Sequence, residues 1–343
     1  MFDPSSSGDN FAPTTRRQWL RLSLGAGATL SAGALGARPE KLAWRERAFL
    51  GLGTSLWLRA GHASARRAEA GLDAAVAAIR HVEHQMSLFD PDSALCRLNR
   101  DGMLASPHPD LVRVFTLAQQ VSARSDGAFD VTVQPLWQAW SAAQKMGRLP
   151  TPGEVASARA KVGWRALQVG ADGIRFQRPG MAVTLNGIAQ GFAGELARAA
   201  LRDAGIEHAL VDSGEWSLLG HSPDASPWTL GVAHPRSPFP VVATLQTDGR
   251  AIATSSDAYC SFSSDHQHHH IFDPQTGYSP GELASVTVVA QSCALADALT
   301  KVFFMGGLDT VIEQARRWNV DVLAFNKAGQ WRASAGISVK LVV

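Results

Sequence analysis

The spacing of apolar residues predicts a mixture of helices and strands along the chain. Apolar positions near helical spacing predict amphipathic helices over residues 68–86 and 111–121. A further helix is expected after a turn at residues 186–191, to about residue 204. Helices are also expected over residues 293–305 and 308–318. Strands are expected over residues 49–59, 181–185, 208–212, 228–233, 240–246, 285–290, 320–325 and 335–342. Because these elements mix without strict strand–helix alternation, the pattern favours an α+β domain over a doubly wound parallel sheet.

Two segments interrupt this pattern. Residues 130–140 are expected to begin as extended chain and to be interrupted at Pro135. Residues 147–156 are rich in proline and glycine, so we expect an irregular excursion there.

The longest uncharged apolar stretch covers residues 22–37 and follows the pair Arg16-Arg17. Its 16 residues, rich in glycine and alanine, are too short to span a bilayer comfortably. A polar start, a twin arginine, an apolar run and small residues at its end are together typical of a Tat export signal. We therefore expect a Tat-type signal peptide over residues 1–37, a linker over 38–48 and one periplasmic domain over 49–343. A poorly ordered N-terminal helix is the alternative.

Composition then narrows the function classes. The chain has 343 residues, and its 32 Lys+Arg against 30 Asp+Glu give a net charge of +2, which argues against nucleic-acid binding. With 45% hydrophobic residues, the chain is expected to fold around a large core. Beyond the N-terminal segment, no apolar stretch is long enough for a transmembrane helix. Its three cysteines make neither a disulfide framework nor a zinc site: Cys96, Cys260 and Cys293.

The glycine-rich turn over residues 186–191, between the strand and the helix expected within 181–204, is the first candidate binding site. Small residues at Gly187, Ala189 and Gly191 let a ligand approach the backbone, and the start of the helix offers free N–H groups to phosphate oxygens. The spacing matches neither the dinucleotide-binding pattern nor the P-loop. A plain structural turn is therefore an equal alternative.

A predicted helix carries the second candidate. Asp297, Thr300 and Lys301 stand at i, i+3 and i+4, so they share one helix face. The Asp and Thr oxygens suit a hard cation such as Mg²⁺, which leaves further positions to water and phosphate. Spacing alone favours the simpler alternative, an Asp–Lys pair.

Two further segments carry candidate residues. His270 precedes an Asp-Pro-Gln-Thr-Gly turn over residues 273–277, and three histidines ahead of it could bind a transition metal: His266, His268 and His269. A solvated loop is the simpler interpretation of those three. In residues 126–133, Gly127 permits a tight entry into a strand. Taken alone, these residue types predict an exported α+β protein with a candidate site for a phosphorylated ligand.

A series of short blocks is specific only as an ordered set. The blocks cover residues 53–54, 86–99, 126–136, 185–192, 211–214, 253–256, 270–277, 285–288 and 296–299. Together they resemble the FAD:protein FMN transferases, also called ApbE or thiamine-biosynthesis-lipoprotein-like flavin transferases. The likeness runs from about Leu52 to the end of the chain. It implies a single large α+β domain of the ApbE type, with a central antiparallel sheet and flanking helices.

This resemblance also implies an activity and its residues. Such proteins split FAD with the help of Mg²⁺ and attach the FMN half through a phosphoester to a Thr or Ser of a target protein. By position, Asp297, Thr300 and the Ala189 carbonyl would hold the metal, and His270 would join the first two as a catalytic residue. The residues expected to contact FAD are Leu52, Phe89, Ala128, Phe129, Asp130, Asn186, Gly187, Gln190, Phe192, Phe272 and Lys301. Of these, Phe89 and Phe192 are suited to stack on aromatic rings.

Three positions depart from the family pattern. Gln190 stands where many members carry Lys, Glu215 where a glycine is usual, and Lys301 where Thr is usual. An ammonium beside Asp297 would either displace Mg²⁺ or contact phosphate in its place. The departures motivate an alternative function, a family member that binds FAD or another flavin without transferring it. A third hypothesis, a metal-binding accessory protein, rests on the histidines of residues 266–270.

Overall fold

The computed structural model describes residues 42–233, 235–236, 241–258 and 260–341. The expected signal peptide, residues 1–37, lies outside the described residues. Glu40–Val343 form one compact unit. The expected linker is wrong in part: the first strand is Ala43–Gly51, so residues 43–48 belong to the folded unit.

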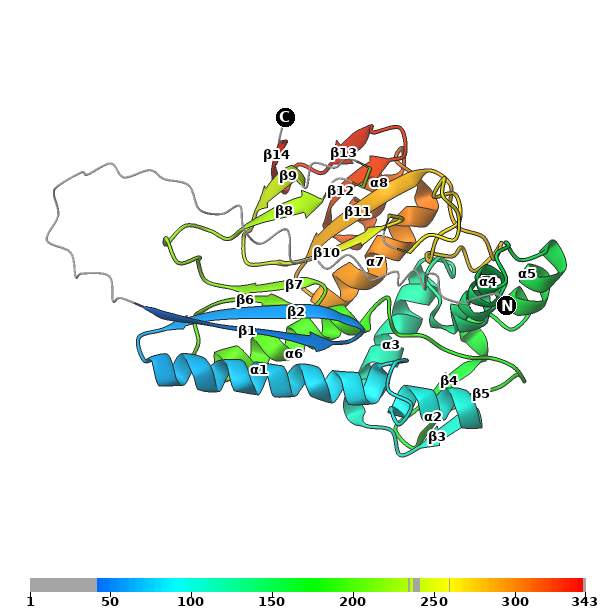
Figure 1. Cartoon of the computed structure of the whole chain (residues 1–343), viewed down its shortest axis with the longest axis horizontal. Helices are drawn as coiled ribbons and strands as arrows, with labels where there is room; N and C mark the ends of the chain where they lie inside the picture. The colour runs from blue at the N-terminus through cyan, green and yellow to red at the C-terminus, as the bar shows by residue number, and fades with distance from the viewer. Residues whose placement is uncertain (1–41, 234, 237–240, 259, 342–343) are drawn as a thin grey trace, which may run out of the picture. The chain divides into compact units, whose positions relative to one another are not determined.

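An eight-stranded antiparallel sheet runs through this unit (Figure 1). Its strand order is β1–β2–β6–β7–β10–β11–β12–β13, and each neighbouring pair is antiparallel. The strands are β1 (Ala43–Gly51), β2 (Thr54–His62), β6 (His208–Asp212), β7 (Trp216–Leu219), β10 (Ala251–Ser256), β11 (Leu283–Ala290), β12 (Asp321–Asn326) and β13 (Trp331–Ala333). Strand β11 is buried along its whole length, which indicates that both faces of the sheet are covered there.

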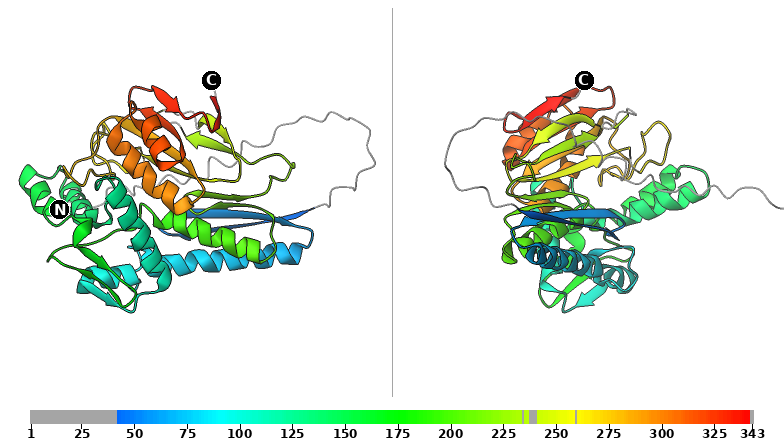
Figure 2. Two further views of the ribbon diagram at one scale, coloured as in Figure 1. Left: turned by 180° about the vertical axis from the view of Figure 1, so that it is seen from behind. Right: turned by 60° about the vertical axis from the view of Figure 1, so that its left-hand side comes forward.

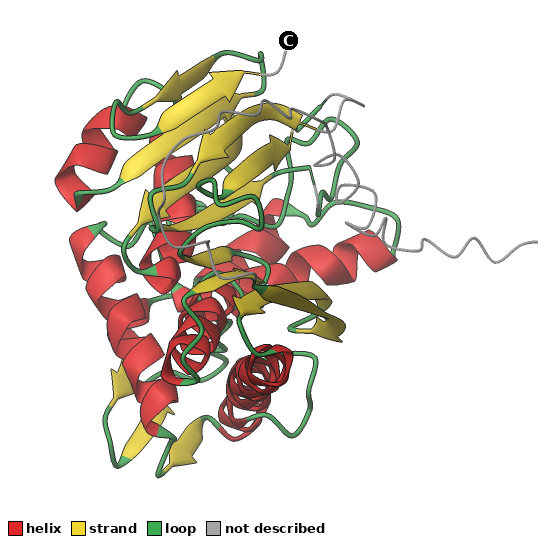
Figure 3. Ribbon diagram, turned by 90° about the vertical axis from the view of Figure 1, so that its left-hand side faces the viewer, coloured by secondary structure: helices red, strands yellow, loops and turns green. Residues whose placement is uncertain are grey.

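Helices cover one face of the sheet and a second sheet covers the other (Figure 3). On β11, Val286 and Val288 pack in the core shared with the helices, whereas Val289 packs on the opposite face. The helices are α1 (Ala65–Met86), α6 (Ala189–Asp203), α7 (Cys293–Gly306) and α8 (Val311–Trp318). The second sheet has the order β14–β9–β8, from Ser338–Leu341, Val241–Gln246 and Thr229–Ala233. The expected single α+β domain with antiparallel sheets and flanking helices is confirmed.

The remaining elements lie between β2 and α6 in the chain and include two helices with a core of their own (Figure 2). Trp140 is buried at the centre of that core, beside Phe262 and Phe272. The elements are α2 (Ala94–Asp101), β3 (Met103–Ala105), α3 (Pro109–Arg124), η2 (Val131–Val133), α4 (Gln134–Lys145), α5 (Pro152–Arg159), η3 (Trp164–Ala166), β4 (Leu167–Val169) and β5 (Gly173–Phe176). In the described part of the chain, no helix is long and apolar enough to cross a bilayer.

Two expected strands are wrong, the first because of a local turn and the second because of a distant partner. The single strand expected over residues 49–59 is two strands joined by a turn at Leu52-Gly53, where both φ angles are positive, 51° and 76°. Residues 181–185 form no strand, although they are mostly buried. The backbone N–H and C=O of Val183 bond instead to the side-chain amide of Asn99, at 2.7 and 2.8 Å.

Two segments expected to be extended or irregular contain helix. The Asp130 side chain accepts the N–H of Thr132 and so caps η2, which leads directly into α4. Pro135 stands in the first turn of α4, where a missing N–H costs no hydrogen bond. The expected excursion over residues 147–156 contains the start of α5, where Thr151 and Glu154 form a capping box.

Candidate functional site

Close packing of α6 on α7 brings the glycine-rich turn beside Asp297. A Cβ at Gly191 would lie 2.7 Å from the carbonyl carbon of Cys293 and 2.8 Å from Cα of Ala294, so only glycine allows this approach. The backbone N–H of Gly191 donates to Asp297 Oδ2 at 3.2 Å. The start of α6 and the polar face of α7 therefore form one site.

Asp297 and Lys301 form an ion pair within α7. The Asp297 side chain is 1% exposed, and its Oδ1 accepts the Lys301 ammonium. The same ammonium also donates to the backbone carbonyl of Asp297 at 3.1 Å. The Lys301 side chain keeps 18% of its surface exposed, whereas the Asp297 side chain is almost fully enclosed.

Thr300 is fully enclosed beside this pair. Its Oγ1 donates to the Asp297 carbonyl at 2.7 Å and lies 2.7 Å from the hydroxyl oxygen of Ser255 on β10. Because a hydroxyl has one hydrogen, Ser255 is then the donor of the second bond. The Thr300 oxygen is thus committed to groups of the protein itself.

Lys301 also joins α7 to two other predicted segments. A Cβ at Gly187 would lie 3.2 Å from Lys301 Cε and 3.4 Å from Phe129 Cε2. The stem of Lys301 therefore lies against the glycine-rich turn and next to the aromatic ring that follows Gly127. Asn186 is exposed at this turn, and Ala189 begins α6. The structure thus brings together residues from segments 126–133, 186–191 and 297–301.

The residues expected to hold Mg²⁺ do not fit that ion in this arrangement. Carboxylate and hydroxyl oxygens are suitable donors. However, Asp297 Oδ1 binds the Lys301 ammonium, Oδ2 accepts the Gly191 N–H, and the Thr300 hydroxyl is bound on both sides. A metal held by Asp297, Thr300 and the Ala189 carbonyl stays a prediction, and the structure contains the Asp297–Lys301 pair that was its alternative.

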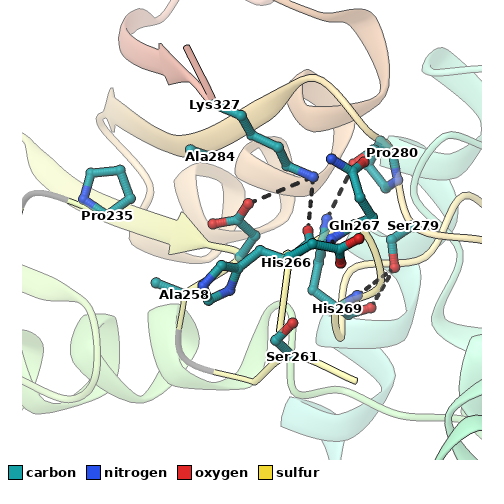
Figure 4. A network of polar contacts seen from close by, with 12 residues as sticks. Pro235, Ala258, Ser261, His266, Gln267, His269, Ser279, Pro280, Ala284 and Lys327 are labelled. Carbon is teal, nitrogen blue, oxygen red and sulfur yellow. Dashed lines mark hydrogen bonds and ion pairs between the residues drawn. The ribbon is translucent and has the colours of Figure 1, made fainter. Parts of the chain in front are cut away.

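His270 lies in a loop that a buried charge network anchors. Its Nδ1 is 3.3 Å from the Cys260 carbonyl, and burial together with the neighbouring His269 ring lowers the pKa of His270 to about 4. Arg236 binds the enclosed Asp257 through two nitrogens, and Lys327 Nζ lies 3.8 Å from the same carboxylate. Lys327 also donates to the His266 carbonyl at 2.8 Å, so these charges hold the histidine loop in place (Figure 4).

The interpretation of the histidine run as a solvated loop is wrong for His269. Its ring is fully buried, its backbone N–H donates to Ser279, and its Nε2 lies 3.2 Å from the Pro280 carbonyl (Figure 4). Burial lowers the pKa of His269 to about 4. Among the described residues, the group with metal-ligand spacing is not this run but His81, His108 and Asp110. In that group, His81 bonds the Asp110 carboxylate and His108 caps α3.

The aromatic residues expected at the flavin differ in their accessibility. Phe89 is 70% exposed and packs over Gly53, where a Cβ would lie 2.6 Å from the ring. Leu52, in the same hairpin turn, is held by an N–H bond to Glu83 at 2.7 Å. Phe192 is 1% exposed and Arg113 covers its ring at 5.2 Å, so the structure contradicts the stacking expected for it.

Other expected contacts have structural roles in the described chain. Asp130 accepts bonds from Thr132 and from the N–H of Trp164, and burial raises its pKa. Phe272 packs in the core around Trp140. Ala128 is partly buried against the main core, and Phe129 is largely buried in it.

The two other departures from the family pattern are both accommodated by packing. Gln190 lies across Gly214, where a Cβ would lie 2.5 Å from its amide carbon and φ is +100°. Glu215 is buried, and its carboxylate accepts the N–H of Thr254 on β10 at 2.8 Å. The sequence predicts no role for Ser255, and only its place in the block 253–256 could have pointed to it.

Comparisons with known proteins identify the family of this chain. The model of the ApbE family matches residues 52–324. A FAD:protein FMN transferase of Salmonella typhimurium is 30% identical over 259 residues, covering 71% of this chain and 73% of its own. A FAD:protein FMN transferase of Vibrio cholerae is 30% identical over 260 residues, covering 73% and 77%.

Solved structures match the fold over most of both chains. The ApbE protein of Thermotoga maritima aligns with a TM-score of 0.78 at 25% identity, over 86% of this chain and 98% of its own. The apo flavinyl transferase ApbE of Pseudomonas stutzeri aligns with a TM-score of 0.72 at 26% identity, over 89% and 96%.

Proposed function

This chain belongs to the ApbE family, and on that premise we propose that it is a FAD:protein FMN transferase. FAD is its flavin substrate, and a protein bearing a Thr or Ser is its acceptor. The observation that carries the proposal is the meeting of three motifs at Lys301, where the glycine-rich turn, Phe129 and α7 come together. The curated relatives that match over about three quarters of their own length are named for this activity.

The reaction exchanges one phosphate linkage for another. The acceptor hydroxyl oxygen attacks the phosphorus of the FMN half of FAD, and the anhydride bond to the AMP half breaks. AMP leaves with the electron pair of that bond, and the hydroxyl proton passes to the AMP phosphate or to water. No redox change is involved, so catalysis consists of positioning the two groups and neutralising negative charge on phosphate.

The chain supplies groups for both tasks. The start of α6 places the positive end of the helix dipole at the glycine-rich turn, although the N–H groups of Ala189 and Gly191 already bond Leu185 and Asp297. The Lys301 ammonium provides a full positive charge beside that turn. His270 is neutral at pH 7, because burial, with the neighbouring His269, lowers its pKa to about 4. Exposed Phe89 offers an aromatic face to the flavin ring.

The test is transfer to a panel of threonine- and serine-bearing acceptor peptides. Purified protein lacking residues 1–37 is incubated with FAD, and the products are read by mass spectrometry and by AMP release. We expect a peptide that gains the mass of FMN less water, with one AMP per modified peptide. Absence of both modified peptide and AMP across the panel would contradict the proposal.

The alternative of flavin binding without transfer is favoured by one observation, the neutralisation of Asp297 by Lys301. It predicts a yellow protein that retains FAD intact. Stoichiometric flavin binding with no AMP released over the same incubation would establish it in place of the transferase.

We propose further that the protein acts in the periplasm after Tat export, on the strength of Arg16-Arg17 and the apolar run that follows. Replacing both arginines with lysine is expected to hold the protein in the cytoplasmic fraction. Unchanged periplasmic localisation of that variant would contradict a twin-arginine signal.

A further inference from the structure

We infer that the Lys301 ammonium is the resident cation of this site and that FMN transfer proceeds without a divalent ion on Asp297. The inference rests on the proposed function, which it deepens by naming the group that meets the FAD phosphates. The side-chain oxygens expected to hold Mg²⁺ contact other groups of the protein instead.

Both carboxylate oxygens of Asp297 already contact groups of the protein. Lys301 bonds Oδ1 and Gly191 bonds Oδ2, while the carboxylate itself is 1% exposed. A divalent ion at Oδ1 would have to displace the ammonium or lie beside it. Two positive charges a few ångströms apart repel strongly where burial weakens solvent screening. The paired carboxylate therefore favours one cation over two.

Lys301 is also restrained from swinging away. A Cβ at Gly187 would lie 3.2 Å from Lys301 Cε and 3.4 Å from Cε2 of the Phe129 ring. The stem is thus packed between the turn and the aromatic ring, and the ammonium donates to two oxygens of Asp297. Displacing it would break both bonds and the packing of the stem together.

The ammonium keeps a donor for the ligand. An ammonium has three N–H groups, and Asp297 takes two of them. The third makes no bond to the described part of the chain, so it can be donated to a phosphate oxygen. The point charge of the ammonium and this one hydrogen bond, together with the positive end of the α6 dipole, would replace the charge that a metal supplies.

Metal binding and FMN transfer, measured together, distinguish an ammonium that acts on the substrate from a merely structural Asp297–Lys301 pair. The proteins are wild type, Lys301→Thr, Lys301→Met, Asp297→Asn and the double variant with Lys301→Thr and Asp297→Asn. Lys145→Thr, on an exposed helical lysine, is the matched control. Each is titrated with Mn²⁺ alone, followed by electron paramagnetic resonance, and assayed for FMN transfer in EDTA and in Mg²⁺.

For wild type and for Lys145→Thr, we expect rates of FMN transfer in EDTA and in Mg²⁺ that agree within about twofold. We expect neither protein to have a Mn²⁺ site that depends on Asp297, so Asp297→Asn should bind as much Mn²⁺ as wild type. Lys301→Thr should gain a Mn²⁺ site that the double variant lacks. Its transfer in EDTA should fall by about 100-fold, the effect typical of removing one preorganised donor to a transition-state oxygen, and Mg²⁺ should restore part of it. Lys301→Met keeps the packed stem, so it should lose transfer in EDTA even if the Thr variant folds poorly.

Two results would overturn the inference. One is wild-type transfer that stops in EDTA and returns with Mg²⁺; the other is a wild-type Mn²⁺ site that Asp297→Asn abolishes. If no variant transfers FMN or releases AMP, the proposed function fails by itself. The Mn²⁺ titration then still decides which cation Asp297 holds: a site gained only on replacing Lys301 supports the ammonium, and a wild-type site contradicts it.

Discussion

Replacing Gly191 with alanine tests whether the contact between α6 and α7 builds the site. Gly191 is the second residue after the start of α6, and its N–H donates to Asp297. An alanine Cβ there would lie 2.7 and 2.8 Å from backbone atoms of Cys293 and Ala294. Backbone cannot rotate away as a side chain can, so the two helices would have to move apart.

The size of the effect follows from two opposing contributions. Alanine improves helix propensity over glycine by up to about 1 kcal/mol. Overpacking a buried contact costs about 1–3 kcal/mol, and a clash with backbone belongs at the upper end. We therefore expect a net loss of about 1–2 kcal/mol in the free energy of unfolding. Gly153→Ala is the matched control, because it is also helical and its Cβ would meet only Thr151 Oγ1 at 4.0 Å.

Urea denaturation followed by circular dichroism measures both variants against wild type. We expect a lower midpoint for Gly191→Ala with an unchanged m-value, and for Gly153→Ala a midpoint that is unchanged or slightly higher. FAD binding should weaken only in Gly191→Ala, since the turn and Asp297 move relative to each other. If Gly191→Ala is as stable as Gly153→Ala, α6 and α7 do not meet as described and the site's construction is refuted.

Three further predictions concern other parts of the chain. Since the folded pKa of His269 is about 4 against 6.5 unfolded, this residue should lower stability by about 2–3 kcal/mol as pH drops from about 6.5 to 4. His269→Asn should reduce that slope in urea titrations at several pH values, and the slope that remains should include His270, whose pKa burial also lowers to about 4. Ser292→Ala should destabilise by about 1 kcal/mol because its hydroxyl caps α7, whereas Ser64→Ala, at an α1 N-cap without a side-chain bond, should not; equal thermal shifts would contradict this. Phe89→Ala should weaken FAD binding in fluorescence titration with little loss of stability, whereas the buried Phe192→Ala should lose about 3–5 kcal/mol, and the reverse pattern would refute the assignment of the exposed ring to the flavin.

Residues whose environment is set within a few positions were predicted correctly from the sequence. The helix expected over residues 68–86 is α1, Ala65–Met86, because its apolar spacing repeats over the whole segment. The strand expected over 208–212 is β6 with the same bounds. The class of fold followed from the mixture of such segments. Apolar periodicity is a local property, and these elements needed nothing more.

Features that depend on distant partners were predicted poorly. Residues 181–185 are apolar and buried, as a strand would be, yet Val183 bonds Asn99, which lies 84 positions earlier. Phe192 follows the glycine-rich turn, as a flavin-stacking ring would, yet Arg113 on α3 covers it. An apolar pattern reports burial. It does not report whether a neighbouring strand, a side chain or a ligand provides it.

The Asp297–Lys301 pair shows why motif spacing alone cannot separate a metal site from an ion pair. Positions i, i+3 and i+4 place an acid, a hydroxyl and an ammonium on one helix face in either case. A hard cation needs those oxygens free of other donors. What occupies them comes from elsewhere: Gly191, 106 positions before Asp297, takes one carboxylate oxygen, and Ser255, 45 positions before Thr300, bonds the hydroxyl. Only the fold brings these donors to α7, and they leave the ammonium of Lys301 as the cation the site can hold.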